Sequence, residues 1–187
     1  MLKRLCLALV LLTSSALMTA PGRAMPLAVM ADIPLGPAIP GESRYAGAVV
    51  RTVRGMIEYT RWPQRNDPLV LCVAGPTQHA GQIGSIRLSD GRRVDRRNVN
   101  ATPGALGGCH ILYLGNLAIA LQRQLTEAVR GRGVLTIAEA DPSNAAEAMF
   151  AFTYKPNGLS FRLNVDAVSR SGLRVDPRVL RLSQGGA

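Results

Sequence analysis

Two carboxylates, Glu139 and Asp141, are the residues whose type and position could support general acid–base catalysis. They follow the apolar run Val134–Ala138, which predicts a strand, and enzymes often place carboxylates in the loop after a strand. No base partner is spaced to work with them, and the sequence contains no G-x-S-x-G, P-loop, C-x-x-C or H-E-x-x-H motif. We therefore predict that the protein is not an enzyme, has no catalytic residue and binds no cofactor.

Cys72 and Cys109 could form a disulfide. Cys72 lies in the apolar run Leu69–Ala74 and Cys109 shortly precedes the apolar run Ile111–Leu114, so two adjacent strands could bring the sulfur atoms together. In an exported protein an even pair of cysteines favours a disulfide, and two buried free thiols are the alternative. No second pair of ligands is spaced to complete a metal site with Cys109, so we predict no metal.

Residues 1–24 have the organisation of a cleavable signal peptide. Lys3 and Arg4 form a short positive region, Leu5–Leu12 is an unbroken apolar run, and Gly22-Arg23-Ala24 supplies small residues for cleavage. The apolar run is too short to span a bilayer comfortably, which disfavours a retained membrane anchor. Cleavage would remove Cys6 and three basic residues, and would lower the formal charge from +10 to +7. We expect a periplasmic protein.

One α/β domain is predicted at 44–187, after a proline- and glycine-rich lead-in at 25–43. Its strand–helix–strand order implies a right-handed parallel crossover, and therefore a mixed β-sheet flanked by helices, with a C-terminal hairpin plus short helices. The predicted elements are a helix capped by Ser43 and ended by Trp62-Pro63, a strand Leu69–Ala74, a short helix near 78–83, one or two polar strands within 85–99, a strand 110–114, a helix capped by Asn116, a strand Val134–Ala138, two hairpin strands at 149–154 and 159–165, and short helices at 166–171 and 177–182.

A cluster of basic residues lies in the least regular part of the chain, at Arg92, Arg93, Arg96 and Arg97. Such a cluster could bind nucleic acid or anionic lipid, or it could be a solvated loop. Export makes nucleic acid an improbable partner. We therefore favour the solvated loop and predict no nucleic-acid partner.

The segment after Gly172 is the predicted partner-binding surface. It combines arginines with apolar residues on one helical face, and interfaces favour arginine around a few apolar anchors. Part of this face must close the core. Together with residues of the run 161–170, we expect it to contact a partner or a second copy through Leu173, Arg174, Val175, Arg178, Val179, Arg181 and Leu182. The only tryptophan, Trp62, is expected to pack as core, with a binding hot spot as the alternative.

Five segments carry one family resemblance. They are Val53-Arg54-Gly55-Met56-Ile57-Glu58-Tyr59-Thr60-Arg61-Trp62-Pro63, then Leu71-Cys72-Val73, Gly108-Cys109-His110-Ile111-Leu112-Tyr113-Leu114-Gly115-Asn116, Leu135-Thr136-Ile137-Ala138-Glu139, and the closing run from Phe161 through Asn164-Val165-Asp166-Ala167-Val168-Ser169-Arg170-Ser171-Gly172 to Leu182. In register, over about 44–183, they resemble the YfiR family of periplasmic proteins.

This resemblance implies a non-enzymatic repressor. YfiR-like proteins bind the periplasmic sensing domain of an inner-membrane diguanylate cyclase, hold it inactive, and so lower cyclic-di-GMP and biofilm formation. An outer-membrane, peptidoglycan-associated lipoprotein can sequester the repressor, and a homodimer is expected. Cys72 and Cys109 match the core disulfide of the family. Many members carry a second cysteine pair, where Asn144 and Ala151 align here.

A different class of function remains open from the residues alone. A periplasmic small-ligand-binding protein would use a pocket at the carboxyl ends of the strands. In this sequence that pocket would lie near Gly75-Pro76, Gly115-Asn116 and Glu139.

Overall fold

The computed structural model describes residues 32–37 and 39–184, so the predicted signal peptide lies outside the described residues. The strands are β1 (Ile33–Pro34), β2 (Thr60–Arg61), β3 (Leu69–Ala74), β4 (Ile86–Arg87), β5 (Arg93–Val99), β6 (Ile111–Leu114), β7 (Leu135–Ala138), β8 (Phe150–Lys155), β9 (Gly158–Leu163) and β10 (Arg174–Val175). The α-helices are α1 (Ala46–Glu58), α2 (Ile119–Ala128) and α3 (Val165–Ser169), and the 3-10 helices are η1 (Pro103–Leu106) and η2 (Pro177–Gln184).

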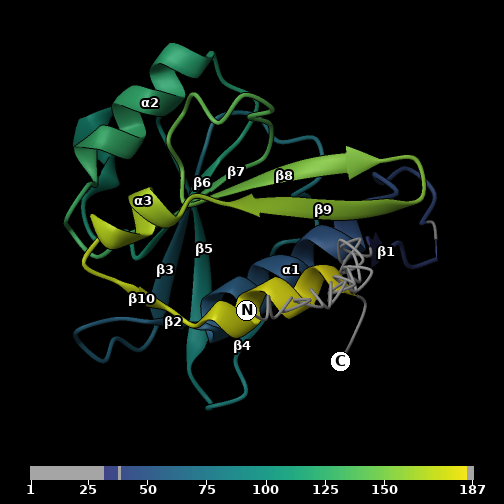
Figure 1. Cartoon of the computed structure of the whole chain (residues 1–187), viewed down its shortest axis with the longest axis horizontal. Coiled ribbons are helices and arrows are strands. Elements are labelled where there is room, and N and C mark those ends of the chain that lie inside the picture. Colours follow the sequence, from purple (N-terminus) through teal and green to yellow (C-terminus); the bar gives the residue numbers. More distant parts are fainter. Residues whose placement is uncertain (1–31, 38, 185–187) are drawn as a thin grey trace, which may run out of the picture.

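One mixed sheet organises the fold, as predicted. Its order is β1-β9-β8-β7-β6-β3-β5-β4, and β10 pairs with β2 in a separate two-stranded sheet. The central strands β5, β3, β6, β7 and β8 are parallel, while β4, β9 and β1 pair with their neighbours in the antiparallel sense. Helix α2 connects the adjacent parallel strands β6 and β7, which confirms the predicted crossover (Figure 1).

Each face of the large sheet carries its own core. The cluster on one face contains the buried side of α1, together with Tyr113 and the aromatic residues of β8 and β9. The smaller cluster on the other face contains Cys72, Cys109 and the buried side of α2. Because side chains alternate along a strand, the apolar runs of the central strands supply both clusters. Figure 1 shows α1 and η2 lying side by side on the face opposite α2.

The first helix is shorter at both ends than predicted. Ser43 does not cap α1; the N-cap residue is Tyr45, and the Ser43 hydroxyl instead bonds the ring of His79. The helix ends at Glu58, because Thr60–Arg61 pairs with β10 and this pairing requires extended backbone. The Thr60 hydroxyl donates to the carbonyl of Met56 at 2.7 Å and satisfies one of the carbonyls at the helix end.

Two other helix predictions were wrong in detail. Asn116 does not cap α2, which begins at Ile119 after Ala118. Leu117 lies before the helix, where it packs directly against Gly75. The stretch 78–83 forms turns instead of a short helix, and the buried residues Ala80 and Ile83 fix it to the core.

The remaining local predictions hold. The polar stretch 85–99 contains β4 and β5, and β8 and β9 form the hairpin with Pro156 and Asn157 at its turn. The lead-in contributes more than a connection, because Ile33–Pro34 adds an edge strand to β9. Within the described ranges, no helix has the length and apolar character needed to cross a membrane.

Candidate partner-binding site

The predicted partner-binding segment forms two short elements on the α1 side of the molecule. β10 pairs with β2, with Arg174 opposite Arg61 and Val175 opposite Thr60. The backbone N–H of Asp176 then donates to the carbonyl of Tyr59 at 2.9 Å and holds the start of η2 against the end of α1. The segment is thus anchored by the strand that the sequence had assigned to the first helix.

The apolar residues of this segment face the core. Leu173 and Val179 are buried, and Val175 and Leu182 are half-buried. Leu182 packs so closely on α1 that a Cβ atom at Gly55 would lie 2.7 Å from its methyl carbons. Most of the apolar residues predicted to contact a partner therefore pack against the protein's own core instead.

Three arginines of the segment, Arg174, Arg178 and Arg181, are exposed, and Leu180 is exposed beside them. Arg178 donates to both carboxylate oxygens of Asp176, and these hydrogen bonds lower the pKa of Asp176 to about 2. Its guanidinium also lies 5.9 Å from the ring centre of Tyr59. Arg178 is thus held in place, whereas Arg174 and Arg181 form no side-chain hydrogen bond within residues 32–37 and 39–184.

The structure joins Cys72 and Cys109 by a disulfide, with the two Cα atoms 5.7 Å apart. Cys72 lies within β3 and Cys109 just before the neighbouring parallel strand β6. The guanidinium of Arg97 lies over the bond, 3.5 Å from one sulfur and 3.6 Å from the other, and donates to the carbonyl of Gly107 at 2.7 Å. The disulfide belongs to the core on the α2 face, where it ties β3 to β6.

The two candidate carboxylates are buried and serve the fold. Glu139 accepts from the backbone N–H groups of Gln78 and His79, at 2.9 and 2.8 Å, and from the Tyr113 hydroxyl at 3.0 Å. Asp141 accepts from the backbone N–H groups of Ala145 and Ala146. Because buried carboxylates need such donors, both residues are accounted for by the loops they hold.

Space at the carboxyl ends of the strands is largely filled. Leu117 packs on Gly75, whose φ of +84° suits a residue without a side chain, and a Cβ at Gly115 would lie 2.3 Å from the carbonyl oxygen of Pro76. Together with the buried Glu139, these contacts occupy the place where a small-ligand pocket was expected.

Sequence reasoning missed an aromatic group around Glu139. His79 contacts Tyr45 and Tyr154 with ring centres 5.1 and 4.2 Å apart. Burial raises the pKa of Tyr113 well above its usual range, and burial together with the charge of Glu139 raises that of Tyr154. Both phenols therefore stay protonated. These residues come from four separate segments, so no local pattern could have indicated the group.

Trp62 occupies an intermediate position. It packs against the α1-side core, is half-buried, and has the Arg92 guanidinium 6.0 Å from its ring centre. It lines a hollow of about 550 Å³ between β2 and the β4–β5 turn, called the Trp62 hollow below, and a second hollow of about 310 Å³ near Cys109 and Arg132. The predicted core packing is thus combined with partial exposure.

Among residues 32–37 and 39–184, no cluster of His, Cys, Asp or Glu is placed to hold a metal ion. A mixed sheet, a disulfide that ties two central strands and a C-terminal segment with exposed arginines define a small α/β protein. The chain belongs to the YfiR/HmsC-like family, whose family model matches residues 48–184. Membership identifies a periplasmic regulator of diguanylate cyclase signalling.

Proposed function

We propose that the protein is a periplasmic repressor without enzymatic activity. It binds the sensing domain of an inner-membrane diguanylate cyclase and lowers cyclic-di-GMP and biofilm formation. The observation that carries this proposal is the family match over residues 48–184, which spans the disulfide and the partner-binding segment. The structural use of Glu139 and Asp141 supports a role in binding rather than catalysis.

On this chain, the proposed contact surface is the exposed side of β10 and η2. Its members are Arg174, Arg178, Arg181 and Leu180, presented over the end of α1. Arginine offers planar, multidentate hydrogen bonding, and an ordered arginine loses less side-chain entropy when it binds. Arg178, which Asp176 already orders, fits that requirement.

Two further partners belong to the proposal. An outer-membrane, peptidoglycan-associated lipoprotein sequesters the repressor and releases the cyclase, and two copies of the repressor form a homodimer. Leu180 is 37% exposed, which makes it an apolar anchor available to either contact.

The test is a binding measurement with the purified periplasmic domain of each membrane-anchored diguanylate cyclase of the same organism. We expect one domain to bind, and we expect Arg181→Glu with Leu180→Ser to weaken binding at least tenfold. This pair is chosen because, within the described residues, Arg181 forms no side-chain hydrogen bond and Leu180 is not part of the core, whereas Arg178 is bonded to Asp176.

Arg123→Glu is the matched control, since it reverses one charge on α2, across the sheet. It should bind like the wild type. Failure of every cyclase domain to bind the wild type contradicts the proposed function. Undiminished binding by the η2 variant contradicts only the location of the surface.

A further inference from the structure

Four exposed arginines at one end of the molecule form no side-chain hydrogen bond or ion pair among the described residues. They are called the basic end here and are Arg61, Arg65, Arg93 and Arg174. Figure 1 shows the segment after β2 and the β4–β5 turn projecting from the same end, and the two segments line the Trp62 hollow together. Four guanidinium groups without a direct ion pair in the described part of the chain thus gather where the parallel strands β3, β5 and β6 begin.

The register of the two-stranded sheet places two of these positive charges opposite each other, which destabilises the pairing of β2 with β10. Arg61 of β2 stands directly opposite Arg174 of β10. Like charges at directly opposite positions of an antiparallel pair destabilise the pairing. A ligand that supplies negative charge at this point would remove the cost.

Carboxylates near the basic end are already engaged elsewhere. Glu58 accepts from Arg54 and from the backbone N–H of Ser89, and Asp90 pairs with Arg92 at 2.7 Å. Asp67 accepts from the backbone N–H of Arg93 at 3.1 Å. Asp176 pairs with Arg178; the charges of Arg61 and Arg65 act on Asp176 and Asp90, respectively, but neither carboxylate forms a hydrogen bond or ion pair with them. The four guanidinium groups therefore keep their hydrogen-bond donors for an external anion.

An aromatic side chain lies among these charges. Trp62 is half-buried and forms part of the wall of the Trp62 hollow, next to Arg61 and Arg65. Tryptophan beside arginine is the combination that proteins place at the level of lipid headgroups, where both the ring and the cation find suitable surroundings.

We propose that the basic end binds the anionic headgroups of a phospholipid membrane surface. Arginine binds phosphate through paired hydrogen bonds, and a membrane offers many phosphates side by side. That arrangement matches arginines spread over β2, β5, β10 and the loop after β2, whereas one acidic side chain of a protein partner would satisfy one of them. The basic end shares Arg174 with the surface proposed to bind the cyclase but contains none of its other members, and the inference does not depend on the proposed repressor role.

The experiment is cosedimentation of protein purified from the periplasm with vesicles of phosphatidylcholine alone or with about one third phosphatidylglycerol. We expect binding to the anionic vesicles only, weakening as salt rises. Arg61→Ser with Arg65→Ser should reduce the affinity about thirtyfold, since each arginine near an anionic surface is worth ~1 kcal/mol. This double variant keeps Arg174 and the other members of the surface proposed to bind the cyclase, so none of those residues is replaced.

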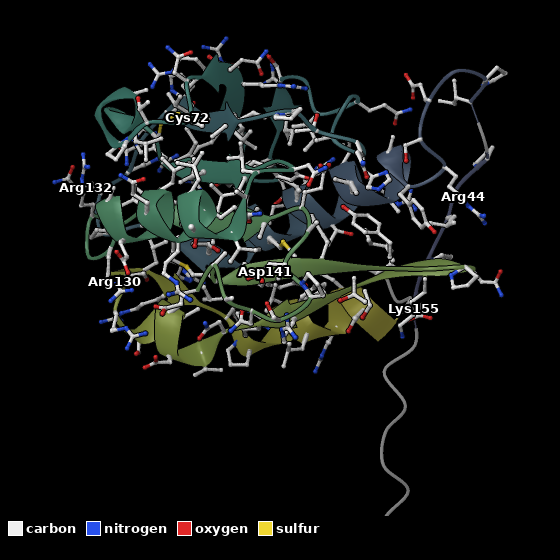
Figure 2. All side chains as sticks on the ribbon, turned by 90° about the horizontal axis from the view of Figure 1, so that it is seen from above. Arg44, Cys72, Arg130, Arg132, Asp141 and Lys155 are labelled. Carbon is white, nitrogen blue, oxygen red and sulfur yellow. A yellow bond between two sulfur atoms is a disulfide. The ribbon has the colours of Figure 1, made fainter. Side chains whose placement is uncertain are left out.

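The charge control is Arg44→Ser with Arg123→Ser, which removes the same charge elsewhere, together with one hydrogen bond from each side chain to a backbone carbonyl. Arg132 lines a hollow together with Trp62, and Figure 2 shows Arg44 at the opposite end of the molecule from Arg132. Arg44 is therefore distant from the basic end. The control should bind anionic vesicles like the wild type, with circular dichroism verifying that all variants fold.

Three results would overturn the proposal: no binding to anionic vesicles, equal binding to neutral ones, or equal losses in the two double variants. Binding to polyglutamate without binding to vesicles would also overturn it, in favour of an acidic polypeptide partner.

Discussion

Replacing Glu139 by alanine tests how far one buried carboxylate holds the strand ends together. In the folded protein Glu139 is 1% exposed and accepts three hydrogen bonds, two from backbone N–H groups and one from Tyr113. The alanine variant would leave three donors without their acceptor. A buried donor that loses its partner costs about 1–3 kcal/mol.

Part of this cost is offset, because the wild type must remove a carboxylate from water and a water molecule can enter the space left by the variant. We therefore expect Glu139→Ala to lower the free energy of unfolding by about 3 kcal/mol or more. For a domain of this size the loss corresponds to a fall in Tm of roughly 6–12 °C.

Urea and thermal unfolding followed by circular dichroism would measure the change. Glu139→Gln keeps the shape and one acceptor oxygen and should lose less than the alanine variant. Glu127→Ala, on the exposed side of α2, is the control and should stay within about 0.5 kcal/mol of the wild type. A Glu139→Ala variant that stays within about 1 kcal/mol of the wild type would refute the reasoning.

Two further predictions concern stability. Replacing Cys72 and Cys109 together by alanine removes a link across 37 residues and should lower the free energy of unfolding, measured with a chemical denaturant, by about 4 kcal/mol. Mass spectrometry of the unreduced wild type should show the two tryptic peptides linked, and free thiols would contradict the prediction. His110 accepts from the backbone N–H of Val70, and burial lowers its pKa, so the folded state resists protonation. Stability should therefore be lost as the pH falls below about 6.5, and His110→Asn should lose less than the wild type between pH 7 and 5; equal losses would show that His110 contributes nothing.

The strands of the central sheet could be predicted because their sequences are continuous apolar runs. Leu69–Ala74, Ile111–Leu114 and Leu135–Ala138 are buried on both faces of a parallel sheet, which leaves no alternation of polar residues to confuse the pattern. The hairpin turn was equally readable, since Lys155-Pro156-Asn157-Gly158 favours a tight reversal.

Helix ends were less predictable because distant contacts decide them. Thr60 and Arg61 continue a helical pattern, yet they pair with β10, more than a hundred residues later in the chain. Leu117 continues the apolar stripe of α2, yet it packs on Gly75. Local propensity is a weak guide where tertiary pairing competes with it.

Which residues of the proposed partner-binding segment are exposed could be predicted in part. Its arginines are exposed as the sequence suggested, but helical spacing alone could not say that Leu173 and Val179 would be buried. Their burial follows from the pairing of β10 with β2, which sets the direction of the chain before η2. The hydrogen bonds of Glu139 could not be predicted from the sequence either, because its donors lie in two segments that are distant along the chain.

Repression of a diguanylate cyclase is the central claim, and intracellular cyclic-di-GMP tests it most directly. Deleting the gene should raise cyclic-di-GMP and biofilm mass, and expression of the wild-type protein in the periplasm should return both to the starting level. The variant with Arg181→Glu and Leu180→Ser, exported in equal amount, should fail to do so. Unchanged cyclic-di-GMP after the deletion would contradict the account.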